Sequence, residues 1–288
     1  MKKYITVLAV AVALMACNKK ETTNTTTDVV ENQKEQNQKM VSLNGAVTET
    51  LAALGATDQI VGVDVTSTYP EDLKSKTTDL GHVRSITAES ILSLKPTVVF
   101  ATSKDINPTL NEQLKKAGVE LVVIDQEYSV DGTKKLITEV ANQLNKQDYQ
   151  PLIHNIDNQL KAVKPFEKKP KVLFIYARGA GNLMVAGKET PLHNMIELAG
   201  AENAAATLTD FKPLTPEALL TNNPDVILMF DSGLQSLGGA EGLLKVEGIA
   251  ATNAAKNNKI ITMDGQLLSG FGPRLGEAVV ELNTKLNK

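Results

Sequence analysis

One tyrosine has both the chemistry and the position to bind a metal ion. Tyr69 follows an apparent strand at residues 60–64, and ligands bind at the carboxyl ends of strands in open α/β sheets. Pro70 biases Tyr69 towards an extended backbone, which suits presentation from a loop. A phenolate is a hard anionic oxygen donor, but the pKa of a free phenol is about 10, so a nearby cation must favour the charged form. A packed ring with a solvated hydroxyl is the alternative interpretation.

Three arginines are the candidate cationic partners, and the chain contains no others: Arg84, Arg178 and Arg274. A guanidinium fork also binds a carboxylate through two parallel hydrogen bonds. Gly179 and Gly181 beside Arg178 would let a flat ligand approach the backbone, although they could equally form an ordinary turn. Each arginine could instead be a surface residue, so the residues alone leave the choice open.

Histidine is the other candidate donor. His82 could be a second metal ligand or a contact on the face of a ligand. His154 falls in a predicted helix and His193 in a helix that begins near Pro191, so we expect both to be structural or solvated. The three histidines are dispersed without a spaced cluster of acids, which makes a zinc or manganese site a weak alternative.

The composition excludes several classes of protein. The 288 residues are 42% hydrophobic and 22% charged, with a formal net charge of −3, which is typical of one large or two ordinary globular domains. This balance argues against nucleic acid as a partner, because phosphates require a basic face. A single cysteine excludes a disulfide framework and a multi-thiolate metal site. The sequence has no P-loop, Rossmann glycine motif or nucleophile elbow, so we expect that the protein is not an enzyme. We also expect a monomer.

The first residues have the pattern of an export signal. Two lysines precede an apolar run at residues 5–14, which is too short to span a membrane. The segment L-M-A-C resembles the lipobox of bacterial lipoproteins, so we expect removal of residues 1–16 and lipid attachment to Cys17. A plain secretory signal with an incidental cysteine is the alternative. Residues 17–39 are strongly polar and predict a flexible tether with a reach of roughly 25 Å.

Strand and helix patterns alternate from residue 40 onward. Short β-branched runs predict strands at residues 41–43, 60–64, 97–101, 120–125, 171–176, 225–230 and 259–263, and helical patterns lie at 48–54, 87–94 and 108–117. This alternation predicts an α/β fold of two Rossmann-like lobes, residues 40–131 and 167–288, with a ligand cleft between them. Residues 132–166 contain no strand-like run and predict a helical connector that is broken near Pro151.

The two predicted lobes contain a repeated motif. T-A-E-S-I-L begins at Thr87, and T-P-E-A-L-L begins at Thr215. Glu89 and Glu217 therefore hold equivalent positions near helix N-termini, where the helix dipole favours a carboxylate. Each glutamate could simply stabilise the start of its own helix.

The chain resembles the substrate-binding proteins of bacterial haem ABC importers, in the class with a helical backbone between the lobes. The resemblance covers nearly all of residues 40–288, and its motifs are V-S-L-N-G-A-V-T-E-T-L-A-A-L-G at 41–55, V-G-V-D-V-T-S-T-Y-P at 61–70, L-G-H-V-R-S-I-T-A-E-S-I-L-S-L-K-P at 80–96, L-M-V-A-G at 183–187, F-K-P-L-T-P-E-A-L-L at 211–220 and G-F-G-P-R-L at 270–275. The segments T-S-T-Y-P and G-F-G-P-R-L point to haem, whereas the strand-and-proline motifs are shared with cobalamin and siderophore binders.

The resemblance implies a haem site. It implies that Tyr69 is the axial ligand of ferric haem, a role for which tyrosine is established. It also implies that Arg274 is a cleft cation near that tyrosine or a haem propionate. Arg178, Arg84 and His82 are the further candidates for haem contacts, although His82 stands where similar proteins often carry an aromatic residue.

The resemblance also implies partners and a location. Glu89 and Glu217 would dock onto the permease dimer of an ABC importer, which works with an ATPase. The lipid on Cys17 would hold the protein at a membrane of the cell envelope, facing the periplasm. A siderophore or corrinoid binder of the same fold is the nearest alternative, and a metal-dependent enzyme on this fold is the alternative from another class.

Overall fold

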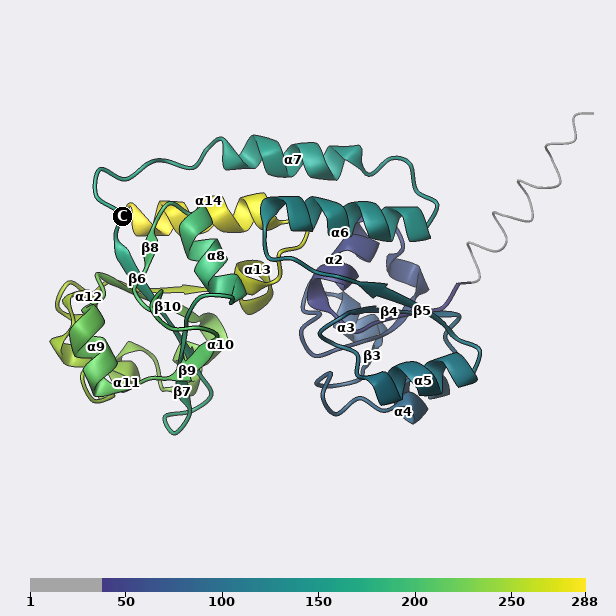
Figure 1. Ribbon diagram of the computed structural model, residues 1–288, viewed down its shortest axis with the longest axis horizontal. Helices are drawn as coiled ribbons and strands as arrows, with labels where there is room; N and C mark the ends of the chain where they lie inside the picture. Colours follow the sequence, from purple (N-terminus) through teal and green to yellow (C-terminus); the bar gives the residue numbers. More distant parts are fainter. Residues whose placement is uncertain (1–37) are drawn as a thin grey trace, which may run out of the picture. The chain divides into compact units, whose positions relative to one another are not determined.

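The computed structural model describes residues 38–288, which contain two β-sheets with helices packed against them (Figure 1). The predicted export signal, Cys17 and nearly all of the predicted tether lie outside the described residues. Within residues 38–288, no helix is both long enough and apolar enough to cross a bilayer.

The first sheet is parallel and has the strand order β3-β2-β1-β4-β5. Its strands are β1 (Met40–Ser42), β2 (Ile60–Val63), β3 (Thr78–Asp79), β4 (Val98–Thr102) and β5 (Glu120–Ile124). The helices of this lobe are α2 (Gly45–Ala53), η1 (Thr57–Gln59), α3 (Leu73–Lys76), α4 (Ala88–Ser93) and α5 (Pro108–Lys116). Because the strand order reverses at β1, the carboxyl ends of β1, β2 and β4 border the crevice in which ligands of such sheets bind.

Strand β4 shows why the predicted strands form here. Val98 and Phe100 belong to one hydrophobic cluster, and Val99 and Ala101 belong to another on the opposite face. All four are nearly inaccessible to solvent. A strand buried on both faces needs a continuous apolar run rather than alternation, and β-branched residues fit that pleated surface.

The second sheet is mixed. Its strands follow the order β11-β10-β6-β7-β9, with β8 paired to β6. They are β6 (Lys171–Ala177), β7 (Leu183–Ala186), β8 (Glu202–Asn203), β9 (Phe211–Pro213), β10 (Val226–Phe230) and β11 (Ile260–Met263). The helices are α8 (Pro191–Leu198), α9 (Pro216–Asn222), α10 (Asp231–Ser236), α11 (Ala240–Leu244), η2 (Ile249–Ala251), α12 (Asn253–Lys256), α13 (Gly265–Ser269) and α14 (Leu275–Leu286).

The strands β7 and β9 were not among the predicted strands, and both pair antiparallel to their neighbours. Only residues 178–182 separate β6 from β7. A connection this short can join antiparallel neighbours, whereas a parallel pair needs a crossover of a dozen or more residues. The alternating strand–helix pattern therefore describes this lobe incompletely.

The segment between the lobes forms two helices, α6 (Val130–Gln143) and α7 (Gln150–Leu160), and Pro151 lies in the first turn of α7. A proline is tolerated there because the first backbone N–H groups of a helix have no intrahelical acceptor. The helix α7 packs along α14, and α6 packs against α2 (Figure 1). Lys134 and Asp157 form an ion pair of 2.6 Å between α6 and α7.

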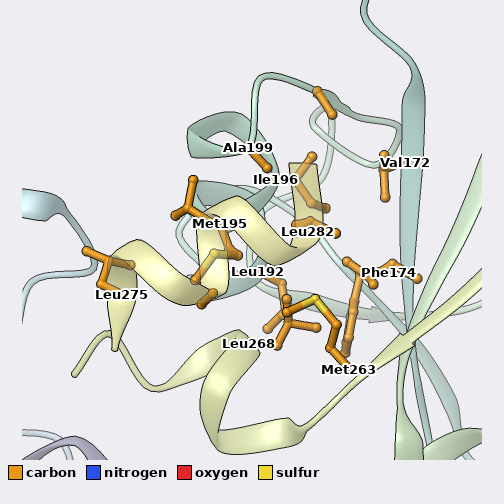
Figure 2. Close-up of a cluster of buried hydrophobic side chains, with 14 of the residues drawn as sticks. Val172, Phe174, Leu192, Met195, Ile196, Ala199, Met263, Leu268, Leu275 and Leu282 are labelled. Atoms are coloured by element: carbon orange, nitrogen blue, oxygen red, sulfur yellow. The ribbon is translucent and has the colours of Figure 1, made fainter. Parts of the chain in front are cut away.

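A buried cluster in the second lobe fixes the short helix α13. Figure 2 shows Leu268 of α13 among Leu192, Phe174 and Met263, and Leu268 is fully buried. Asp264 caps the helix by accepting a hydrogen bond of 2.8 Å from the backbone N–H of Leu267. A helix of five residues is not stable by propensity alone, so packing and this cap hold it in place.

Candidate functional site

A cavity of about 380 Å³ lies between the two lobes, within the size range of small-molecule sites. The first lobe contributes residues just beyond the ends of its strands, and the second lobe contributes the start of α13. The lining includes Asn44, Asp64 and Asp105 from the first lobe and Phe230, Gly265 and Gln266 from the second.

Tyr69 and Arg274 come from different lobes and lie against each other where the lobes meet; neither lines the cavity, but Thr68 beside Tyr69 does. The Arg274 Cζ atom is 3.6 Å from the centroid of the Tyr69 ring. A cation over an aromatic face is attracted by the quadrupole of the ring. Tyr69 is 38% exposed. The pair thus combines an accessible oxygen donor with an adjacent positive charge.

Glu49 holds Arg274 in this position. The Glu49 Oε1 atom accepts a hydrogen bond of 3.0 Å from the Arg274 backbone N–H, and Oε2 accepts one of 2.9 Å from Nη2. Burial alone would lower the pKa of Arg274, but the hydrogen bond and the charge of Glu49 outweigh it and hold that pKa above its usual value. Arg274 is therefore a fixed cation. Within residues 38–288 its Nε has no acceptor.

The start of α2 brings Glu49 to the cleft. Asn44 caps the helix by accepting hydrogen bonds from the backbone N–H groups of Ala46 and Val47. Gly45 is required next, because a Cβ atom there would lie 2.7 Å from the carbonyl oxygen of Thr66. The helix can therefore pack tightly against the loop that carries Tyr69.

Gln266 joins the same loop to the second lobe. Its Oε1 accepts hydrogen bonds from the backbone N–H of Thr68 at 2.6 Å, from Thr68 Oγ1 at 2.9 Å and from the backbone N–H of Tyr69 at 2.9 Å. Its Nε2 donates to the Gly45 carbonyl at 2.8 Å and to Glu49 Oε2 at 3.1 Å. All of these partners belong to the first lobe.

Asp64 shapes the beginning of this loop. Its Oδ2 accepts hydrogen bonds from the backbone N–H and the hydroxyl of Thr66, at 2.9 and 2.6 Å, and Oδ1 accepts one from Ser67 Oγ at 2.7 Å. Burial raises the pKa of Asp64, although these hydrogen bonds partly oppose that effect. The buried carboxyl group of Asp64 therefore organises the segment 64–67, which leads from β2 towards Tyr69.

Tyr128, unlike Tyr69, lines the cavity, but its environment disfavours a phenolate. Burial raises the pKa of Tyr128, and the nearby charge of Asp105 raises it further. Lys104 lies over its ring, with Nζ 4.5 Å from the centroid. The phenolate form of Tyr128 is therefore disfavoured.

The other predicted haem contacts lie on exposed loops. Arg84 and Arg178 are exposed, and within residues 38–288 neither guanidinium forms a hydrogen bond or ion pair. His82 is exposed, and its Nδ1 accepts a hydrogen bond of 3.2 Å from the backbone N–H of Arg84. A neutral imidazole with Nδ1 as acceptor carries its proton on Nε2, so His82 must break this contact or change tautomer to bind a metal. Val83, which lies between His82 and Arg84, lines the cavity, so the loop that carries these two residues borders the cavity.

Glu89 and Glu217 occupy the second position of α4 and α9, and both are exposed. The caps of these helices are Thr87 and Thr215, whose hydroxyls accept the backbone N–H of the third helical residue. In α4 the reciprocal bond of the capping box comes from Ser90 rather than from Glu89. Neither glutamate is needed for a capping bond. Cys17 lies outside the described residues.

Sequence reasoning missed Glu49 and Gln266, the two residues that hold the cleft together. Glu49 is the single charged residue in the otherwise uncharged stretch from Val41 to Gly55, and a lone acid on a helix with so many buried positions is a signal that could have been used. Gln266 gives no comparable signal, since a glutamine in the first turn of a helix is ordinary.

Titratable side chains do not gather into a second candidate centre. Within the part of the chain that the structure describes, no three His, Cys, Asp or Glu side chains converge as a metal site. His193 lies on α8, where its Nδ1 is 3.2 Å from the Asn203 side-chain nitrogen, and His154 lies on α7.

A sequence model of periplasmic binding proteins matches residues 40–267, and the chain belongs to that family. The family consists of binding proteins rather than enzymes, and membership implies a location in the cell envelope. The predicted architecture of two α/β lobes with a helical connector is confirmed.

The chain is similar to proteins of this kind, among them one solved structure and two relatives. The solved structure of the periplasmic heme-binding protein RhuT from Roseiflexus sp. RS-1, in apo form, is 38% identical, covers 86% of this chain and 97% of its own, and superposes with a TM-score of 0.83. The ABC transporter substrate-binding lipoprotein YvrC of Bacillus subtilis is 31% identical over 86% of this chain and 80% of its own length. The vitamin B12-binding protein of Pectobacterium atrosepticum is 25% identical over 86% of this chain and 88% of its own.

We expect Glu49→Ala to lower the free energy of unfolding by about 3 kcal/mol, because it leaves the charge of Arg274 without its partner in a partly buried site. Urea denaturation measures this change. The matched control is Glu281→Ala, which removes a surface ion pair with Lys285 on α14 and should change stability by less than about 0.5 kcal/mol. Equal and small changes in both variants would contradict the role given to Glu49.

Proposed function

We propose that this protein captures ferric haem in the cleft between its lobes and delivers it to an ABC permease. The observation that carries the proposal is the contact between Tyr69, an accessible phenol, and Arg274, a fixed cation, where the two lobes meet. Phenolate oxygen suits ferric iron, and tyrosine is an established haem ligand. The likeness to a heme-binding protein over nearly the whole described chain supports the same ligand.

The propionates of haem require partners of their own. Arg84 and Arg178 are exposed and carry guanidinium groups that are free for such contacts within residues 38–288. A guanidinium fork matches the geometry of a carboxylate. We therefore assign propionate binding to these two arginines, with His82 as a contact on the porphyrin face.

Titration with ferric haem tests the proposal, and Tyr69→Phe tests the ligand. Wild-type protein should bind haem saturably with the absorption bands of an iron–phenolate complex. Tyr69→Phe should keep the fold but lose those bands and release haem faster, because it removes the oxygen donor alone.

Tyr149→Phe is the matched control, since it removes a hydroxyl from a half-buried tyrosine beside α7. It should bind haem as the wild type does. A phenolate spectrum that persists in Tyr69→Phe would show that Tyr69 is not the axial ligand.

A corrinoid is the second candidate ligand, because the vitamin B12-binding relative matches over much of this chain. In that case Tyr69 would pack against the ligand instead of binding a metal. A parallel titration with cyanocobalamin decides between the two: tight cobalamin binding without saturable haem binding would favour this alternative.

The proposed delivery of haem also requires a lipid anchor at the membrane and a docking site for the permease. We assign lipidation to Cys17, so that the described domain is held near the membrane by its tether. Glu89 and Glu217, one on each lobe, would dock onto the two halves of the permease. Their equivalent helix positions, their exposure and the capping of both helices by threonine support a role outside the fold.

Charge reversal separates docking from haem binding. The double variant Glu89→Arg with Glu217→Arg should bind haem normally yet fail to support ATP-driven import by the cognate permease in proteoliposomes, because rim charges set encounter and register. Glu139→Arg with Glu281→Arg makes the same charge change on α6 and α14 and should import haem at the wild-type rate. Import by the first variant at that rate would rule out docking through these two residues.

A further inference from the structure

The backbone of the proposed iron ligand is held by the lobe to which it does not belong. Within residues 38–288, the acceptor for the Tyr69 backbone N–H is Gln266 Oε1, at 2.9 Å. The same oxygen accepts from Thr68 Oγ1 and shares the Thr68 backbone N–H with the Thr66 carbonyl. Three donors of one loop thus converge on a single oxygen across the cleft.

The amide of Gln266 is fixed in orientation. Its Nε2 donates to the Gly45 carbonyl and to Glu49, so rotating the amide would turn the NH₂ group towards the three donors of the loop. Gln266 is only 8% exposed, which makes each lost hydrogen bond costly. Gln266 therefore presents Oε1 to the loop in one geometry.

The helix that carries Gln266 is itself immobilised in the second lobe. Leu268 lies in the hydrophobic cluster of Figure 2, two residues from Gln266, and Asp264 caps the helix. By contrast, the hydrogen bonds that Asp64 makes within the first lobe end at Ser67, before Tyr69 is reached. The Tyr69 backbone N–H is thus held from α13, whereas the Pro70 carbonyl that follows it accepts the Leu73 backbone N–H within the first lobe.

We propose that Gln266 is a positioning residue that holds the Thr68–Tyr69 loop so that the Tyr69 oxygen can bind iron, which makes retention of haem depend on the arrangement of the two lobes. The inference rests on the proposed function of haem capture through Tyr69. Any movement that separates α13 from the loop breaks all three hydrogen bonds together and frees the iron ligand. Lobe separation is therefore a route to haem release.

Gln266→Met tests the proposal, because methionine has a similar volume and removes the hydrogen bonds without leaving a large cavity. We expect haem to dissociate about tenfold faster from this variant, which corresponds to about 1.4 kcal/mol. The iron–phenolate absorption band should also weaken or shift. Transfer of haem to a scavenger protein measures the rate.

Thr133→Val is the matched control. It removes a buried hydrogen bond between the connecting helix α6 and the second lobe, the 3.0 Å contact from Thr133 Oγ1 to the Phe271 carbonyl, without touching the loop. A merely structural loss should affect both variants alike, whereas the proposal predicts a wild-type phenolate band and a dissociation rate within about twofold of wild type for Thr133→Val.

The outcomes separate this inference from the proposed function. No phenolate band in the wild type would contradict haem capture through Tyr69 and, with it, this inference. A wild-type band together with an unchanged rate in Gln266→Met would overturn only the role of Gln266, as would equal acceleration in Thr133→Val. If circular dichroism shows that Gln266→Met does not fold, Thr68→Val decides: dissociation about threefold faster supports the proposal, and an unchanged rate overturns it.

Discussion

The arrangement of the cleft depends on one carboxylate that has been taken out of water. Glu49 is 4% exposed, and a buried charge persists only where a counter-charge and hydrogen bonds satisfy it. Its partners are Arg274 and Gln266, both from the opposite lobe. The same carboxylate therefore fixes the cation over the Tyr69 ring and one end of the Gln266 amide. Glu49 lies on α2 and Gln266 lies on α13. Both helices are short, and packing and N-terminal caps hold them in place.

Two different environments of tyrosine explain why only one of them suits the proposed chemistry. Tyr69 is partly exposed beside a guanidinium that is always charged, whereas burial and, after it, the charge of Asp105 raise the pKa of Tyr128. Local electrostatics therefore disfavour Tyr128 as the donor, although it lines the cavity. The proposed haem function rests on this difference together with the likeness to a heme-binding protein of the family.

The bounds of most strands could be predicted from the sequence to within a residue or two. Short β-branched runs such as V-V-F-A in β4 are typical of strands that are buried on both faces. The antiparallel strands β7 and β9 were not predicted: β7 is apolar but has only four residues, and β9 has three, of which Lys212 is charged and Pro213 is unfavourable in a strand. Tyr69 and Arg274 were identified through motifs, but Glu49 and Gln266 were not. Their hydrogen bonds join residues 197 to 225 positions apart, and no local spacing encodes such contacts.

Amide hydrogen exchange of ligand-free protein tests the central claim, that the loop of Tyr69 is held across the cleft, most directly. If Gln266 holds the loop, the Tyr69 backbone N–H should exchange at least about a hundredfold more slowly than in an unstructured chain, and Gln266→Met should abolish that protection. The Val65 backbone N–H, which donates to the Gly81 carbonyl at 2.8 Å within the first lobe, should stay protected in both proteins. Unprotected exchange at Tyr69 in the wild type, with Val65 still protected, would contradict the account.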